Sequence, residues 1–183
     1  MPTTRMTNYD RRMVRLMNNP QGRPLYATAA RRRLVVAVHI TLTAAFGALM
    51  THLYLAESEP MWTILVMAVL LLPWMIATGV INAATRGLLE LRERVLDERQ
   101  SAERSRVLAR AHRVMTLLLV TAAAGLLMAG AASGDAPRAY VAPVLIATLV
   151  AHWLMPLWVA GLMAQDEPAD DEAFVVTTAD SMT

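Results

Sequence analysis

The sequence predicts an all-α integral membrane protein, a four-helix transmembrane bundle with a charged helical hairpin between its second and third helices. Apolar residues make up 56% and charged residues 17% of the 183-residue chain, whereas an average soluble domain has roughly 25% charged residues. Most arginines lie before the first apolar run or between the second and third. Four long apolar runs contain no Asp, Glu or Arg, and they span residues 34–56, 61–84, 114–132 and 139–163.

The polar and basic residues 1–33 predict a short amphipathic helix. Apolar residues recur on one helix face, arginines occupy the other side, and Thr7 or Asn8 is a candidate N-cap. Such a helix can lie on a membrane surface of anionic lipid headgroups. Alternatively, this segment is a disordered basic tail that only fixes the topology. The apolar positions are Tyr9, Met13, Leu16 and Met17, and the arginines are Arg11, Arg12 and Arg15.

Each apolar run is long enough for a membrane crossing, which requires at least about 17–20 residues. A soluble core helix would carry a polar face at a spacing of 3.6 residues, and these runs carry none. The first run is too long, and begins too late, for a cleavable signal peptide. We therefore expect four transmembrane helices.

The placement of arginine predicts the orientation of these helices. Eight arginines precede the first run and eight lie between the second and third, whereas residues 57–60 contain none and residues 133–138 contain one. Arginine-rich segments stay on the cytoplasmic side of the membrane. Both termini and the middle segment are therefore expected in the cytoplasm, in a multi-pass protein of the plasma (cytoplasmic) membrane.

The composition excludes several kinds of chemistry. The chain has no cysteine and no lysine, so thiolate nucleophiles, disulfides, cysteine-based metal sites and Schiff bases are excluded. The apolar runs lack the acidic or arginine side chains that ion-driven transporters generally use. No Gly-rich phosphate loop, paired carboxylates or Ser/His/Asp set occurs at a common depth. We therefore expect a non-enzymatic protein with no metal and no cofactor.

Three polar residues inside the predicted helices, His39, Asn82 and His152, are functional candidates. They could line the path of a small oligomeric transporter or channel. Histidines on two facing helices could also bind a b-type haem, but no two histidines are predicted at matched depth. Neutral histidines that hydrogen-bond between helices are the simpler alternative.

Small residues recur every four positions on one face of the third apolar run and at two positions of the first. Such faces let two helices approach closely, either within the bundle or across a homodimer. The residues are Thr121, Gly125, Ala129 and Ser133 in the third run, and Ala44 and Ala48 in the first.

Residues 85–113 predict the helical hairpin. Apolar residues at helical spacing indicate that the second transmembrane helix continues to about Leu96. Asp97-Glu98-Arg99-Gln100 has the form of a capping box and predicts the start of a second arm, which runs into the third transmembrane helix. A single helix along the membrane surface is the alternative. The apolar positions are Leu88, Leu91 and Val95 in the first arm and Leu108, Ala111 and Met115 in the second.

The charged hairpin is the candidate docking surface for a cytosolic or membrane protein partner. In the alternative interpretation its arginines only obey the positive-inside rule and solvate one face. No nucleic-acid binding is expected, because eight arginines are interleaved with five acidic residues and no nucleic-acid-binding motif accompanies them. The candidate partner-binding residues are Arg92, Arg94, Asp97, Glu98, Arg99 and Arg106.

The segment Leu96-Asp97-Glu98-Arg99-Gln100, with the Arg- and Ala-rich stretch to Arg113, resembles a pattern in small multi-helix membrane proteins of actinobacteria and other bacteria. In those proteins a Leu-Asp-Glu-Arg element lies in the cytoplasmic loop before a transmembrane helix. Most are of unknown function, and some similar proteins are encoded beside small transcription regulators. The resemblance covers about eighteen residues and implies a topology rather than an activity.

Residues 164–183 are expected to form a disordered acidic tail in the cytoplasm. They contain six acidic residues and no basic one, a composition typical of disorder. Phe174-Val175-Val176 is a small apolar island within this tail. It could serve as a docking motif or fold back on the arginines.

Overall fold

The structure, a computed structural model, describes residues 7–17, 22–56, 61–92, 96–133 and 138–164. Every regular element within these residues is a helix, so the predicted all-α class is confirmed for them. The helices are α1 (Asn8–Met17), α2 (Arg23–Tyr26), α3 (Ala29–Leu55), α4 (Met61–Ala84), α5 (Glu98–Ser133) and α6 (Arg138–Met163).

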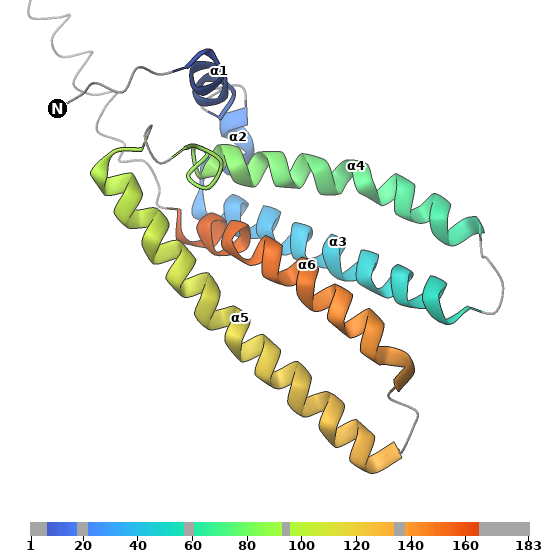
Figure 1. Cartoon of the computed structure of the whole chain (residues 1–183). Coiled ribbons are helices and arrows are strands. Elements are labelled where there is room, and N and C mark those ends of the chain that lie inside the picture. Colours follow the sequence, from blue (N-terminus) through green and yellow to red (C-terminus); the bar gives the residue numbers. More distant parts are fainter. Residues whose placement is uncertain (1–6, 18–21, 57–60, 93–95, 134–137, 165–183) are drawn as a thin grey trace, which may run out of the picture.

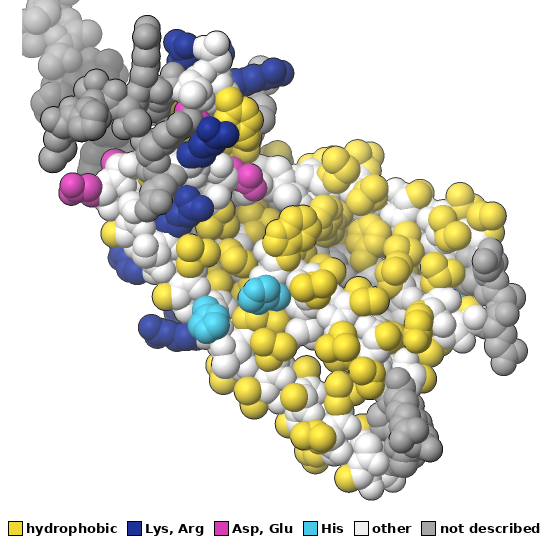
Figure 2. Space-filling view, viewed as in Figure 1, with side chains coloured by type: hydrophobic (Ala, Val, Ile, Leu, Met, Phe, Trp, Pro, Cys, Tyr) yellow, Lys and Arg dark blue, Asp and Glu magenta, His cyan; other side chains and the backbone are white. Residues whose placement is uncertain are grey.

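Four of these helices, α3, α4, α5 and α6, are long and apolar enough to cross a membrane. Large apolar side chains cover much of their outer surface (Figure 2). Leu65, Val69 and Leu127, for example, are 60%, 73% and 76% exposed. An apolar exterior of this extent is a liability in water and suits a hydrocarbon solvent. The chain is therefore a candidate multi-pass membrane protein.

The long helices are arranged so that α3 packs against α4 and α6, and α5 packs against α6. Each of these neighbours runs antiparallel to the other, and the four helices converge at one end and spread toward the other (Figure 1). α1, α2, the beginning of α5 and the ends of α4 and α6 gather where the helices converge. Arginine side chains concentrate there (Figure 2), and this end is called the charged end below.

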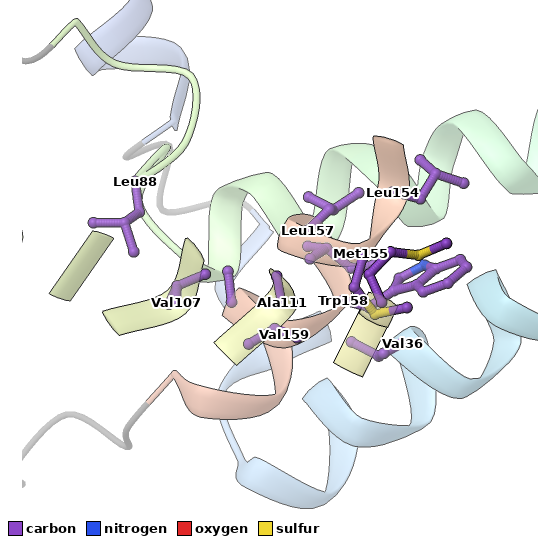
Figure 3. Close-up of a cluster of buried hydrophobic side chains, with 12 residues drawn as sticks. Val36, Leu88, Val107, Ala111, Leu154, Met155, Leu157, Trp158 and Val159 are labelled. Atoms are coloured by element: carbon purple, nitrogen blue, oxygen red, sulfur yellow. The ribbon is translucent and has the colours of Figure 1, made fainter. Parts of the chain in front are cut away.

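The buried core lies next to the charged end (Figure 3). At its centre α6 approaches α3 and α4 closely at Gly161, where an added Cβ would lie 2.8 Å from Val36 Cγ2 and 3.0 Å from Ile81 Cγ2. Only a residue without a side chain permits this approach. The cluster consists of Val36, Ile81, Leu88, Val107, Ala111, Met115, Leu154, Met155, Leu157, Trp158, Val159 and Ala160.

The basic N-terminal segment contains the predicted amphipathic helix, which is confirmed as α1. Thr7 is its N-cap: the Asp10 backbone N–H donates to Thr7 Oγ1 at 3.3 Å, and the Thr7 backbone N–H donates to the Asp10 carboxylate at 3.0 Å. This reciprocal pair is a capping box. α1 lies against the turn that follows α4, where Arg92 stacks 5.2 Å from the centre of the Tyr9 ring. A disordered tail is therefore wrong for residues 7–17.

α4 ends at Ala84 rather than continuing to Leu96, so the predicted first arm of the hairpin is wrong. The Gly87 N–H donates to the Asn82 carbonyl at 2.8 Å, and the Arg86 N–H donates to the Ala83 carbonyl at 3.0 Å. Arg86 and Gly87 have φ values of 52° and 70°. These bonds and the left-handed backbone form a Schellman motif, which terminates a helix.

Residues 85–90 form turns and Leu91 a bend, so this segment is not a helix. Leu88 and Leu91 are nonetheless buried, as the apolar spacing predicted, because the turns direct them toward the bundle. Arg94 and Val95 lie outside the described residues.

The second predicted arm is confirmed as the first turns of α5. The Gln100 backbone N–H donates to Asp97 Oδ1 at 2.6 Å, and the Asp97 N–H donates to Gln100 Oε1 at 3.2 Å. This is the capping box that the sequence predicts. α5 then continues without interruption through the apolar residues to Ser133.

The small-residue faces do not pack within the bundle. Thr121, Gly125 and Ala129 are exposed on α5, and Ala44 and Ala48 are exposed on α3. Apart from the adjacent residues and the backbone of α5 itself, no atom would lie within 4 Å of a Cβ added at Gly125. Packing inside the bundle, one of the two interpretations of these faces, is therefore wrong for these residues.

The end of α4 yields a stability prediction. An alanine at Gly87 would adopt an unfavourable positive φ and bring its Cβ within 2.8 Å of Met17 Cγ. We expect Gly87→Ala to lower the free energy of unfolding by about 1–2 kcal/mol, measured by denaturant titration in mixed micelles. Gly125→Ala is the matched control, because that helical site is open and alanine there should be neutral or stabilising by up to about 1 kcal/mol. Equal effects of the two substitutions would contradict the turn geometry.

Candidate functional site

A groove of about 500 Å³ lies at the charged end, between the turns after α4 and the first part of α5. Its walls combine apolar, hydroxyl and charged side chains, so it offers both a contact surface and hydrogen-bonding groups. The groove is lined by Leu89, Glu90, Leu91, Arg92, Ser101, Arg104, Ser105 and Leu108.

The two sides of this groove are joined by one long side chain. The Arg104 guanidinium on α5 donates through Nη1 to the Leu91 carbonyl at 3.1 Å. Leu91 itself is buried. This bond joins the turn to α5, and it satisfies a carbonyl outside regular structure.

The helical phase of α5 determines which side chains face the groove. Val107, Ala111 and Met115 are almost completely buried in the core cluster. Leu108 is therefore turned away from the core, is 42% exposed and lines the groove. Of the predicted apolar stripe, Ala111 and Met115 belong to the core, whereas Leu108 belongs to the site.

Of the predicted partner-binding residues that the structure describes, Arg92 alone lines the groove. Asp97 lies in the chain between the two groups of lining residues but does not line the groove. The Asp97 carboxylate accepts a hydrogen bond in the capping box of α5. Glu98, Arg99 and Arg106 are exposed on α5 without lining the groove. Arg94 lies outside the described residues.

Arg104 is a groove residue that the sequence analysis missed, together with Ser101 and Ser105. It lies four residues before Leu108 and therefore on the same side of α5. Arg104 could have been found from the sequence, because it lies at helical spacing from Leu108, Ala111 and Met115. Ser101 and Ser105 follow the same helical spacing.

A second feature, inside the bundle, is the buried histidine of α3. His39 has no exposed surface. Its Nδ1 accepts the indole N–H of Trp158 at 2.9 Å, and its Nε2 lies 2.9 Å from Thr78 Oγ1. Trp74 Nε1 donates to Thr43 Oγ1 at 2.9 Å. These five residues, called the His39 network, connect α3, α4 and α6.

The hydrogen bonds of the His39 network assign its protons. Because Trp158 Nε1 can only donate, His39 Nδ1 must accept, and the ring proton of the neutral imidazole lies on Nε2. That proton is donated to Thr78 Oγ1, whose own hydroxyl donates to the Trp74 carbonyl at 2.9 Å. Both ring nitrogens are thus engaged, as in the predicted interhelical hydrogen bonding of a neutral histidine.

The three predicted intramembrane residues do not converge on a path or on a shared iron site. His39 is sealed in its network, whereas His152 is exposed on α6. Asn82 Oδ1 is buried without a hydrogen-bond partner at the charged end of α4. Since neither nitrogen of His39 is open and His152 faces outward, the geometry does not pair these histidines across a haem.

Among the described residues, no three His, Cys, Asp or Glu side chains are grouped closely enough to hold a metal ion. Comparison of the chain with protein-family models, curated proteins and solved structures gives no match in any of the three. The resemblance to actinobacterial membrane proteins therefore stays a prediction, and the functional proposal rests on residues and geometry.

The His39 network predicts a selective loss of stability. Thr78→Val keeps the side-chain volume but removes the acceptor of the His39 N–H. We expect this change to lower the free energy of unfolding in mixed micelles by about 1–2 kcal/mol, because a buried donor is left unsatisfied. Thr121→Val is the control, since Thr121 is exposed and bonds only within its own helix. A loss of similar size in the control would argue against the network.

Proposed function

We propose that the chain is a multi-pass protein of the bacterial cytoplasmic membrane and a non-enzymatic binding, scaffold or regulatory component. In this proposal, the groove at the charged end binds a protein partner. The observation that carries the proposal is a groove beside the apolar spans that combines apolar side chains with two arginines, and whose two sides are joined by the Arg104 hydrogen bond. Nothing in the arrangement of the described residues favours a transport path over this role.

The lining of the groove specifies the chemistry of the partner. Leu89 and Leu108 provide an apolar floor, while Arg92 and Arg104 provide guanidinium groups that bind carboxylates in a forked geometry. Glu90 is the acidic member of the lining. We infer that the ligand is a short segment of a cytosolic or membrane protein, with an apolar side chain flanked by acidic groups.

The proposed orientation places the charged end in the cytoplasm. Arginine placement supports it, because the arginine-rich segments all belong to that end whereas the connections at the other end carry a single arginine. The exposed side chains of Arg11, Arg12 and Arg15 on α1 would then be placed to meet anionic lipid headgroups.

The orientation can be tested with single cysteines, because the chain contains none of its own. A cysteine at the exposed Ala109 of α5 should react with a membrane-impermeant maleimide in inverted membrane vesicles and be protected in intact spheroplasts. A cysteine at Ala56, which follows α3 at the opposite end, should show the reverse pattern. Labelling of Ala109→Cys in spheroplasts would overturn the proposed orientation.

The docking role can be tested by substituting two exposed residues of the groove. Arg92→Glu combined with Leu108→Ser removes a cationic and an apolar contact. If the groove binds the partner, the protein that cross-links to the wild-type chain in its native membrane should be recovered at about one tenth of the wild-type amount or less. This corresponds to a loss of at least about 1.4 kcal/mol of binding free energy. The readout is quantitative mass spectrometry after affinity purification.

Arg113→Glu provides the matched control, because Arg113 is exposed on the same helix but does not line the groove. It should leave recovery unchanged. Thermal unfolding of all variants checks that they fold alike. The same recovered proteins, in the same amounts, from the groove variant and the control would refute docking in the groove.

A further inference from the structure

The outward face of α6 carries two adjacent side chains with hydrogen-bonding groups at the middle of a candidate membrane span. His152 and Trp153 lie next to the midpoint of the span Ala139–Met163. Both are exposed, and Trp153 is exposed by 79%. Within the described part of the chain, neither the imidazole nor the indole N–H has a hydrogen-bond partner.

This position is unfavourable for a single copy in a bilayer. His152 lies six residues from Trp158, which corresponds to about 9 Å along the helix, farther from the charged end than the His39 network. Side chains at such a depth cannot reach the headgroup region or water easily. An imidazole in hydrocarbon then leaves a donor and an acceptor unsatisfied, at a cost of several kcal/mol.

The chain itself shows how an intramembrane histidine is accommodated. His39 is buried and has one partner on each ring nitrogen, from α4 and from α6. His152 has the same hydrogen-bonding groups but points away from the bundle. The difference indicates that the partner of His152 comes from outside this copy and itself lies within the membrane.

We propose that a second copy of this chain covers this face of α6 and forms a homodimer centred on His152. A neutral imidazole is both a donor and an acceptor, so the ring of one copy can donate a hydrogen bond to the ring of the other. Two copies inserted in the same direction place His152 at equal depth without any adjustment. A contact about a two-fold axis joins identical surfaces and therefore brings the two His152 side chains together.

The residues around His152 suit such a contact. Leu145 and Leu149 precede His152 by seven and three residues and therefore share its side of the helix. They are 62% and 68% exposed. Packing of these apolar side chains and of Trp153 across the axis would add van der Waals contacts around the hydrogen bond.

This surface differs from the small-residue face of α5. Gly125 and its neighbours permit close approach of another helix but carry no polar group that demands a partner. The inference also does not depend on the groove at the charged end, because the two surfaces lie on different elements and are tested by different substitutions.

Disulfide cross-linking tests the contact directly, since the chain has no cysteine. Leu149→Cys should form a covalent dimer on mild oxidation, both in native membranes and after reconstitution of the purified chain in liposomes. Leu72→Cys is the matched control: it is 66% exposed near the middle of α4 and should give only the cross-linking expected from random collision.

The role of His152 is tested by energy transfer between labelled copies in liposomes over a range of protein-to-lipid ratios. His152→Leu should raise the dimer dissociation constant by roughly threefold to twentyfold. His152→Asn, which keeps a donor and an acceptor, should restore most of the affinity. His112→Leu, at an exposed histidine outside the apolar span, should have no effect.

Three results would each overturn the proposal: equal cross-linking at Leu149 and Leu72, a monomeric chain at every protein density, or an unchanged dissociation constant for His152→Leu. Cross-linking of Leu149→Cys to a different membrane protein, with the purified chain remaining monomeric, would likewise exclude a second copy as the occupant.

Discussion

The satisfaction of polar groups away from water is the constraint on which this structure depends. In a hydrocarbon solvent the association of apolar helices gains little from burial, so directional hydrogen bonds and close packing must align them. The His39 network does this for α3, α4 and α6. At the charged end the buried Arg32 adds a second tie, donating to the carbonyls of Tyr26 at 3.2 Å and Ala164 at 2.9 Å. The guanidinium thereby meets the negative end of the α6 dipole and connects it to the start of α3.

α5 is attached by different means, and this explains where the groove forms. Val107, Ala111 and Met115 join the apolar cluster against the last turns of α6, and Arg104 bonds to the turn after α4. These contacts all lie at the charged end, from which α5 diverges away from α4 (Figure 1). Because the groove lies at the attachment of α5, anything bound there contacts both the turn after α4 and the helix that this turn orients. Binding at this end would therefore bear on the position of a membrane span.

Sequence patterns predicted where the helices of this fold lie better than which side of each helix is buried. Long apolar runs fix where helices occur, and the capping box at Asp97 is local chemistry that can be recognised without tertiary information. The end of α4 was missed because the left-handed residue of its Schellman motif is Arg86, not the glycine that usually marks that position; Gly87, one residue later, was the weaker signal. Of the predicted docking residues that the structure describes, only Arg92 lines the groove. The sequence could not show whether Leu108 or Val107 is the core residue, because that depends on how α5 packs on α6.

The two mid-helix histidines show why the rotation of each helix about its own axis could not be predicted from the sequence. A span that is apolar on all sides has no polar stripe to indicate which face is inside, so His39 and His152 were equivalent candidates for a path, a haem site or an interhelical bond. Packing separates them: Gly161 brings α6 against α3 and places Trp158 beside His39, and the same rotation of α6 turns His152 outward. Each neutral imidazole has one donor and one acceptor nitrogen that require hydrogen-bond partners. His39 has its partners within the fold, whereas His152 is exposed on α6 and has none among the described residues.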